Sequence, residues 1–310
     1  MEKVYDLAIA GGGPGGVGAG IYASRKKLKT VLITDGFGGQ SAVSPEIQNW
    51  VGTISISGQE LSKNLENHLR EYADDSIQIK DAERVETITQ NDEKLFEIKT
   101  NKETYISKTV LVTTGSHRRK LTAKNADKLE HRGITYCATC DGPLFSNKDV
   151  IVVGGGNAGF ETASQLLAYA KSVTLLDKNE KPKADEITVK KVLSNPNMKL
   201  ISNAKITEIL GDKFVTGLIY EDAKTGEVIE LKTDGIFAEI GAQPTTGFVA
   251  DLVDLNDYGS IPVDPKTQKT SKEGIWAAGD CTDGLYHQNN IAVGDAIKAL
   301  EDIYLYLNTK

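Results

Sequence analysis

The stretch Leu7–Gly16 reads Leu-Ala-Ile-Ala-Gly-Gly-Gly-Pro-Gly-Gly and decides the fold, because an apolar run breaks there into a glycine-rich turn. The stretch Val150–Gly159 repeats the pattern as Val-Ile-Val-Val-Gly-Gly-Gly-Asn-Ala-Gly. Each apolar run has the length of a buried strand, and the segments that follow, Val17–Lys27 and Phe160–Ala170, have the composition of helices. The sequence therefore predicts two strand–turn–helix units with parallel strands.

The two units extend into a divergent internal duplication. Lys29–Asp35 matches Lys171–Asp177, and Thr109–Gly115 resembles Asp234–Gly241. Each copy reads as strand, glycine turn, helix, strand and a later closing strand. We therefore expect an α/β fold with two Rossmann-like three-layer nucleotide-binding domains. An apolar segment and a closing helix lie outside this pattern, at Gly274–Asp280 and Ile291–Leu307.

Length and composition indicate a globular protein of about two domains. The chain has 310 residues, 39% of them hydrophobic, and a net charge of -7 from interspersed acidic and basic residues, which argues against a nucleic-acid surface. No apolar run approaches the roughly 20 residues that span a bilayer, and the chain enters a strand pattern without a leader. Three cysteines do not form a secreted disulfide framework. We expect a cytoplasmic protein without a membrane partner.

Both glycine turns have the spacing of dinucleotide-binding motifs. Glycine lets the backbone approach a pyrophosphate, and the N-terminus of the following helix offers unpaired N–H groups to that anion. The motifs are Gly11-x-Gly13-x-x-Gly16 and Gly154-x-Gly156-x-x-Gly159, and each is followed by an acid, Asp35 or Asp177, near the position that takes ribose hydroxyls.

Asp177 also bears on the choice of nicotinamide cofactor. A carboxylate hydrogen-bonds a free ribose diol and repels a 2′-phosphate, so NADH is favoured over NADPH. Lys178, Lys181 and Lys183 lie just beyond it and either form a solvated face or partly neutralise a phosphate.

The segment Cys137-Ala-Thr-Cys140 can open and close as a disulfide, or can supply half of a zinc site. Zinc needs further ligands, and the remaining cysteine and four histidines form no paired motif. We therefore interpret the pair as redox-active, with Asp141 as an acid that could protonate a leaving thiolate. The sequence Asp141-Gly-Pro fits a turn or helix cap equally well.

Three neighbouring features have plainer interpretations. Cys281 follows Asp280 in a small-residue turn and fits a packed thiol near a cofactor. His287 and Gln288 precede the closing helix, where they could face a ring system, although a lone histidine is more often structural. His117–Lys120 fits a solvated linker between domains.

Together these motifs resemble the low-molecular-weight thioredoxin reductase family, and especially the reductase portion of the alkyl hydroperoxide reductase flavoprotein subunit. The resemblance covers essentially the whole chain. Besides the two glycine turns, the matching segments are Gly38-Gly-Gln40, Gln48-Asn-Trp50, Thr113-Thr-Gly115, Cys137–Gly142 and Gly279-Asp280 with Gln288.

The resemblance implies FAD in a discontinuous domain, residues 1–117 and 245–310, and a nicotinamide cofactor in an inserted domain, residues 118–244, that also carries the cysteine pair. Family members alternate by domain rotation between presenting the nicotinamide and the dithiol to the flavin, and are usually homodimers. The expected FAD-binding residues are Gly11, Gly13, Pro14, Gly16, Asp35, Gly39, Gln40, Asn49, Gly115, Gly279, Asp280, His287 and Gln288. The expected nicotinamide-nucleotide residues are Gly154, Gly156, Asn157, Gly159 and Asp177.

The resemblance also implies separate catalytic roles. Cys140 would face the flavin, Cys137 would attack the partner disulfide, and Asp141 would donate a proton. The chain departs from the NADPH-dependent members, which have His-Arg-Arg where this sequence reads Asp177-Lys-Asn, and it keeps a third glycine at Gly159; both favour NADH. The peroxide-reductase branch carries an N-terminal electron-delivering domain, and since this chain starts at the FAD strand, we expect such a domain to be a separate protein.

We therefore expect an FAD-dependent protein-disulfide reductase that passes electrons from NADH, or NADPH, through the cysteine pair. Its partner would be thioredoxin, a glutaredoxin-like protein or a separate peroxidase-reducing domain. Three alternatives stay open: a related flavoenzyme fed by another donor such as ferredoxin, a flavin-dependent dithiol oxidase, and a non-enzymatic flavoprotein redox sensor. The intact motif at Gly154–Gly159 makes the ferredoxin alternative weaker.

Overall fold

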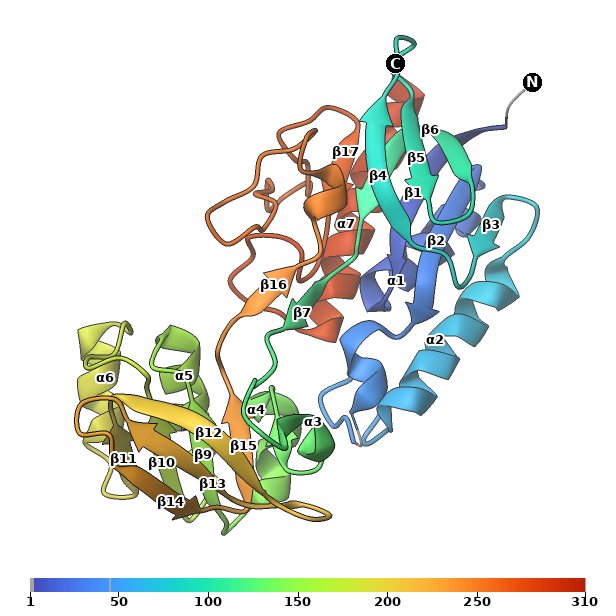
Figure 1. Cartoon of the computed structure of the whole chain (residues 1–310). Coiled ribbons are helices and arrows are strands. Elements are labelled where there is room, and N and C mark those ends of the chain that lie inside the picture. Colours follow the sequence, from blue (N-terminus) through green and yellow to red (C-terminus); the bar gives the residue numbers. More distant parts are fainter. Residues whose placement is uncertain (1–2, 45, 310) are drawn as a thin grey trace. The chain divides into compact units, whose positions relative to one another are not determined.

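The computed structural model describes residues 3–44 and 46–309, and the chain divides into two compact units (Figure 1). Residues 1, 2 and 310, at the ends of the expected FAD domain, lie outside the described part. Unit 1 consists of Met1–Pro45, Trp50–His117 and Gln243–Lys310, and unit 2 of Arg118–Ala242 with the short segment Glu46–Asn49.

Unit 1 is built on a seven-stranded sheet. Its strands are β1 (Val4–Gly12), β2 (Thr30–Phe37), β3 (Ile77–Lys80), β4 (Val85–Gln90), β5 (Phe96–Thr100), β6 (Thr104–Val112) and β17 (Ile275–Ala277). The order is β3-β2-β1-β6-β5-β4, with β17 also paired to β6. β1, β2, β3, β6 and β17 pair in parallel, whereas β4, β5 and β6 form an antiparallel meander.

Helices cover one face of this sheet. They are α1 (Pro14–Arg25), α2 (Gly58–Tyr72) and α7 (Asn289–Thr309), and the short turns η1 (Gly39–Val43) and η3 (Gly247–Val249) belong to the same unit. Glycines let α1 approach α7 closely, since a Cβ on Gly15 would lie 3.1 Å from the oxygen of Ala292. Ala8 and Ala10 point to the opposite face, where they join a buried cluster with residues of β4 and β5. Because both faces are covered, β1 is almost continuously apolar.

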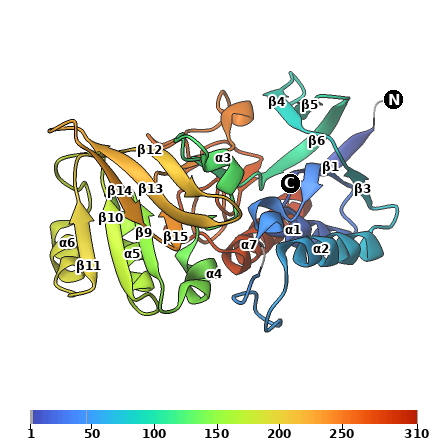
Figure 2. The ribbon, with the colours of Figure 1, turned by 60° about the horizontal axis from the view of Figure 1, so that its bottom comes forward.

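Unit 2 has three layers (Figure 2). Its elements are α3 (Ala126–Leu129), β8 (Ile134–Thr135), α4 (Ala138–Asp141), η2 (Gly142–Phe145), β9 (Asp149–Val153), α5 (Asn157–Leu166), β10 (Ser172–Leu176), α6 (Glu186–Leu193), β11 (Met198–Ile201), β12 (Ala204–Gly211), β13 (Val215–Asp222), β14 (Val228–Lys232) and β15 (Gly235–Ala238). The middle layer is a parallel sheet in the order β11-β10-β9-β15-β8, and β12-β13-β14 form a separate antiparallel sheet.

Strand alternation assigns the two faces of the parallel sheet. Val152 of β9 belongs to a buried cluster with Phe160 of α5 and Val192 of α6. Its neighbour Ile151 belongs to a second cluster with Leu218 of β13. Helices therefore cover one face and the antiparallel sheet covers the other.

Two short strands connect the units. β7 (Ser116–Arg118) and β16 (Ala242–Pro244) pair with each other where the chain leaves unit 1 and returns to it. His117, Arg119 and Lys120 are exposed at the boundary between the units, in line with the expected solvated linker. Backbone pairing orders this segment, and Arg118 is half-buried.

The expected fold class is confirmed, and the helices begin earlier than expected. α1 and α5 each begin three residues before Val17 and Phe160, directly at the glycine turns, and α1 has Pro14 at its first position, where a missing N–H costs nothing. The closing helix is α7, and the segment Gly274–Asp280 contains β17 of unit 1. The sheet β12-β13-β14 was not expected, because its strands alternate weakly in polarity.

The strand registers correct the internal duplication by one residue. Ala10 of β1 pairs with Ile33, and the equivalent Val153 of β9 pairs with Leu176. Asp177 therefore corresponds to Thr34 and not to Asp35. In the same way Ala10 pairs with Val112 and Val153 with Ala238, which makes Glu239 the counterpart of Thr113.

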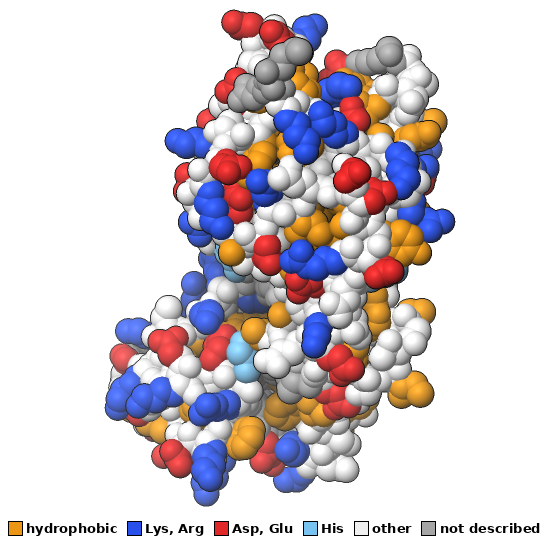
Figure 3. Space-filling model, turned by 90° about the vertical axis from the view of Figure 1, so that its right-hand side faces the viewer, with side chains coloured by type: hydrophobic (Ala, Val, Ile, Leu, Met, Phe, Trp, Pro, Cys, Tyr) orange, Lys and Arg blue, Asp and Glu red, His pale blue; other side chains and the backbone are white. Residues whose placement is uncertain are grey.

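Charges on the surface are mixed. Figure 3 shows one face on which basic and acidic side chains are interspersed, without a large area of one sign. No helix within the described residues is long and apolar enough to cross a membrane.

Candidate cofactor and redox site

Unit 1 contains a cavity of about 400 Å³ at the carboxyl ends of β1, β2 and β6. This volume falls within the usual range for ligand pockets. Nine of the expected FAD-binding residues line it: Gly11, Gly13, Pro14, Asp35, Gly39, Gln40, Gly115, Gly279 and Asp280.

The glycine turn of unit 1 leaves no room for side chains. Gly11 has a φ of +114°, and a Cβ there would lie 2.5 Å from the oxygen of Thr113. A Cβ on Gly16 would lie 1.9 Å from the oxygen of Gly11, so only glycine lets the helix pack this closely against the turn. The turn leads into the N-terminus of α1, whose free N–H groups suit a pyrophosphate. The residues present therefore fit a dinucleotide such as FAD.

Two threonines, one just after β6 and one within β2, bond backbone oxygens of unit 1, and Thr113 also reaches the oxygen of Gly11 in the turn, at 3.2 Å. Thr113 Oγ1 donates to the oxygen of Ala10 at 2.9 Å, and Thr34 Oγ1 donates to the oxygen of Gly36 at 2.5 Å. Their hydrogen bonds stay within the protein. Asp35, one residue beyond Thr34, is exposed and lines the cavity.

Some expected FAD residues do not line the cavity, and some lining residues were not expected. Gly16, Asn49, His287 and Gln288 are absent from the described lining; His287 is exposed, and Asn49 lies in the segment Glu46–Asn49. Their expected role in binding FAD stays a prediction. Lining residues without a sequence signal include Glu83, Arg84, His117, Phe248 and Asn289, which the topology brings to the pocket from separate loops.

Unit 2 repeats the backbone of the turn. Gly154 has a φ of +126°, and a Cβ there would lie 2.2 Å from the oxygen of Glu239. A Cβ on Gly159 would lie 1.8 Å from the oxygen of Gly154. Gly156 has open space beside it and caps the N-terminus of α5, so the backbone is accessible to a phosphate. The residues of this turn fit a second dinucleotide.

Asp177 lies against this turn, and one of its two carboxylate oxygens has no hydrogen-bond partner within the described residues. The residue is 2% exposed, and its Oδ1 accepts from both the backbone and side-chain nitrogens of Asn179 at 3.0 Å. Its Oδ2 would lie 2.0 Å from a Cβ on Gly155 and has no hydrogen-bond partner in the described part of the chain. A buried carboxylate oxygen without a donor is unusual, so Asp177 is suited to accept a hydrogen bond from a ligand.

Asn157 holds a flanking segment rather than pointing freely to solvent. Its Oδ1 accepts from the backbone nitrogen of Asp185 at 2.8 Å, and the nitrogen of Lys183 donates to the oxygen of Gly155 at 2.9 Å. The segment therefore packs on the turn. The three lysines that follow Asp177 are all exposed.

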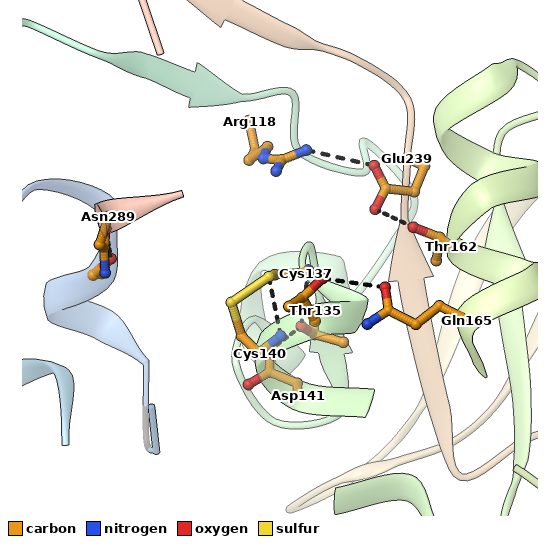
Figure 4. The surroundings of a disulfide bond; sticks show 11 residues. Arg118, Thr135, Cys137, Cys140, Asp141, Thr162, Gln165, Glu239 and Asn289 are labelled. Carbon is orange, nitrogen blue, oxygen red and sulfur yellow. Dashed lines mark hydrogen bonds and ion pairs between the residues drawn. A yellow bond between two sulfur atoms is a disulfide. The ribbon is translucent and has the colours of Figure 1, made fainter. Parts of the chain in front are cut away.

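The two cysteines of unit 2 form a disulfide (Figure 4). Cys137 precedes the single turn of α4, and its Sγ accepts from the backbone nitrogen of Cys140 at 3.2 Å. Both residues are half-buried, which leaves the bond partly accessible. Thr139 between them donates to Gln165 of α5 at 3.1 Å, so the helix that begins at the glycine turn also supports the disulfide segment.

Asp141 ends α4 next to the disulfide. Thr135 Oγ1 donates to its Oδ2, and its Oδ1 is buried without a hydrogen-bond partner among the described residues. Burial raises the pKa of this carboxyl, while the hydrogen bond from Thr135 and the charge of His131 oppose the rise. A carboxyl with a raised pKa keeps its proton closer to neutral pH, which suits a proton donor.

Glu239 is a second buried acid that carried no sequence signal. It follows β15, and its side chain is 7% exposed. Thr162 Oγ1 donates to its Oε1 at 2.9 Å, and Arg118 Nη1 lies 3.4 Å from its Oε2 (Figure 4). Burial raises its pKa, and Arg118 opposes the rise.

Cys281 is fully buried in unit 1. Its Sγ donates to the oxygen of Ala278 at 3.4 Å, and burial raises its pKa to about 11. A thiol in this state is inert, in line with the expected packed residue.

Two units with dinucleotide-type glycine turns, one of which carries a half-buried disulfide, match the architecture of a flavoprotein oxidoreductase. Residues 5–296 match the family model described as pyridine nucleotide-disulphide oxidoreductase. The chain belongs to this family, which implies a flavin and a nicotinamide cofactor.

Individual relatives agree with this assignment. The chain is 38% identical to a protein named NADH dehydrogenase from Bacillus subtilis (strain 168), over 99% of the chain and 59% of that protein. It is 39% identical to the F subunit of alkyl hydroperoxide reductase from Staphylococcus aureus (strain MRSA252), over 99% of the chain and 60% of that protein. The chain thus spans about three-fifths of these relatives.

A solved structure matches over its full length. The thioredoxin reductase from Streptococcus pyogenes MGAS5005 has a TM-score of 0.91 and 32% identity, with 100% of both chains covered. The resemblance inferred from the sequence motifs is confirmed.

Proposed function

We propose that this chain is an FAD-dependent reductase of protein disulfides that takes its electrons from NADH. The observation that carries the proposal is the disulfide between Cys137 and Cys140, which lies in the same unit as a dinucleotide turn and next to Asp141, a half-buried acid whose Oδ1 is buried.

The two units would hold different cofactors. FAD would bind in the cavity of unit 1, against the turn Gly11–Gly16, and NADH against the turn Gly154–Gly159 of unit 2. When bound, the flavin would supply a two-electron carrier between nicotinamide and disulfide. The preference for NADH rests on Asp177, whose buried Oδ2 would accept a hydrogen bond from a ribose hydroxyl and would repel a 2′-phosphate.

The cysteines would do the exchange chemistry. Two electrons and two protons convert the Cys137–Cys140 disulfide into two thiols. The Cys137 thiolate then attacks a disulfide of the partner and forms a mixed disulfide, while the sulfur that leaves takes a proton, which Asp141 would supply. The Cys140 thiolate attacks Cys137 in turn, which restores the internal disulfide and releases the reduced partner.

The partner would be a small protein with a disulfide of its own. Thioredoxin, a glutaredoxin-like protein or a peroxidase-reducing domain fits this description, because a solved neighbour is named thioredoxin reductase and a curated relative is named as part of an alkyl hydroperoxide reductase. We propose a homodimer in the cytoplasm, where a reducing environment keeps such cysteine pairs in catalytic use.

Anaerobic mixing tests the electron donor. The flavin-loaded oxidised protein is mixed with NADH or NADPH, and the visible absorbance of the oxidised flavin is followed with time. We expect bleaching by NADH at lower concentration than by NADPH. The absence of bleaching with either nucleotide would contradict the proposal, and bleaching by reduced ferredoxin alone would replace it.

A serine variant tests the disulfide. Cys140→Ser should keep flavin and its reduction by NADH but should lose reduction of a thioredoxin disulfide by about 1,000-fold or more, since covalent exchange is removed. Full activity of this variant on the disulfide substrate would contradict the assigned role. Cys281→Ala, which alters a thiol outside the pair, is the control and should retain the activity.

A further inference from the structure

The two units differ at one position that the duplication makes easy to identify. Thr113 of unit 1 and Glu239 of unit 2 occupy the same place after equivalent strands. Their backbones behave alike, since the nitrogen of each donates at 2.8 Å to the equivalent strand β1 or β9. Their side chains do not: Thr113 bonds its own turn, whereas the longer Glu239 extends to Thr162 and Arg118.

The position of Glu239 in the sheet indicates which half of a dinucleotide it would meet. In a doubly wound sheet the ligand lies across the carboxyl edge, at the point where the strand order reverses. β9 is the central strand, with β10 on one side and β15 on the other. Asp177 follows β10 and marks the side of the adenosine ribose. Glu239 follows β15, so it belongs to the side of the nicotinamide.

The chemistry of this group suits a carboxamide. The nicotinamide carboxamide has an N–H₂ donor and an oxygen acceptor, and therefore needs an acceptor and a donor beside each other. Each carboxylate oxygen of Glu239 can accept more than the one contact it has, and Arg118 has four further N–H donors besides the one aimed at Glu239. Thr162, on the helix that begins at the glycine turn, holds the carboxylate in place.

We propose that Glu239 and Arg118 form the subsite that receives the nicotinamide carboxamide, with Thr162 as the residue that positions Glu239. This inference rests on the proposed use of a nicotinamide nucleotide and goes beyond it by naming the residues that recognise the nicotinamide half. Arg118 is half-buried and Thr162 is buried, so the pair is held by the protein before the ligand arrives.

Calorimetric titration of the oxidised, flavin-loaded protein tests the subsite without turnover. The ligands are NAD⁺ and ADP-ribose, which lacks nicotinamide. Glu239→Gln should lower the affinity for NAD⁺ by about tenfold, because a hydrogen bond to a charged group is lost. The affinity for ADP-ribose should stay within about twofold of the wild-type value. Asp177→Asn should weaken both ligands. Glu208→Gln is the matched control, because Glu208 is also paired, with Lys124 at 3.0 Å, but lies on β12 of the separate sheet; it should weaken neither.

The positioning role has its own pair of variants. Thr162→Val should weaken NAD⁺ by about threefold and Thr162→Ser should restore it, with ADP-ribose unchanged in both. Equal loss of both ligands in Glu239→Gln, or no loss of either, would overturn the subsite. If the wild-type protein binds neither ligand, the proposed nicotinamide donor is wrong, and the subsite with it. If the wild-type protein binds both ligands but Glu239→Gln does not discriminate between them, only the subsite is wrong.

Discussion

The two glycine turns have the same backbone but are closed by different side chains. In unit 1 the hydroxyl of Thr113 donates to the backbone oxygens of Ala10 and Gly11 at the turn, and the hydroxyl of Thr34 donates to the oxygen of Gly36 in β2. In unit 2 the same two positions hold the acids Asp177 and Glu239, which keep accepting capacity for another molecule. We infer that the first turn suits a cofactor that stays bound, and the second a nucleotide that must be recognised at each turnover.

Matched glycine substitutions give the largest test of this comparison. Gly11→Ala and Gly154→Ala place a side chain at a positive φ and 2.5 or 2.2 Å from a backbone oxygen, so each should cost about 2 kcal/mol or more in its own unit. Gly11→Ala should purify without flavin, and Gly154→Ala should keep flavin but lose bleaching by NADH. Absorbance spectra of the purified proteins and anaerobic mixing measure both effects.

The control for these substitutions is Gly294→Ala. A Cβ there would meet nothing within 4 Å, and alanine favours the helix α7, so the thermal midpoint should stay the same or rise. If Gly11→Ala and Gly154→Ala lose the same ligand, the division of labour between the turns is wrong.

Asp141→Asn separates function from stability. Loss of the proton donor should slow reduction of the partner disulfide at pH 7 by about 100-fold. Because burial raises the pKa of Asp141 in the folded state, the carboxylate lowers stability above that pKa, and this penalty vanishes at low pH where both states are protonated. The variant should therefore melt at a higher temperature than the wild type at pH 8, and by a clearly smaller margin at pH 4. A lower melting temperature at pH 8 would contradict the assigned burial effect.

Asp177→Asn should give the smallest of the three effects. The ratio of NADH to NADPH affinity should fall by about tenfold, since the amide keeps one oxygen but no longer repels a phosphate. Titrations with both nucleotides measure the ratio. Asp212→Asn, on the exposed turn after β12, is the control for loss of one charge. An unchanged ratio in Asp177→Asn would assign cofactor choice to other residues, the exposed lysines first.

The glycine turns and the cysteine pair could be predicted from the sequence because their chemistry is local. Gly11 and Gly154 need a positive φ that only the turn itself requires, and the spacing of Cys137 and Cys140 fits a disulfide without further context. The counterpart of Asp177 in unit 1 could not be identified from the sequence. Thr34 and Asp35 are adjacent, and only the pairing of β2 with β1 decides which of them takes the equivalent position.

Long-range pairing explains the other misses. Arg118 and Glu239 are 121 positions apart and meet because β7, which ends at Arg118, pairs with β16, which begins shortly after Glu239. The lining residues Glu83 and Phe248 reach the cavity from loops that share no motif. Burial of Glu239 likewise depends on α5 and could not be derived from its neighbours in sequence.

The buried thiol of Cys281 gives the protein an internal reporter of unfolding. With Cys137 and Cys140 in their disulfide, the folded chain offers no accessible thiol within its described residues, since Cys281 is 0% exposed and its pKa is raised to about 11. A thiol-reactive dye added to the oxidised protein would therefore label one site only when unit 1 opens. The rate of labelling would record how often that unit unfolds.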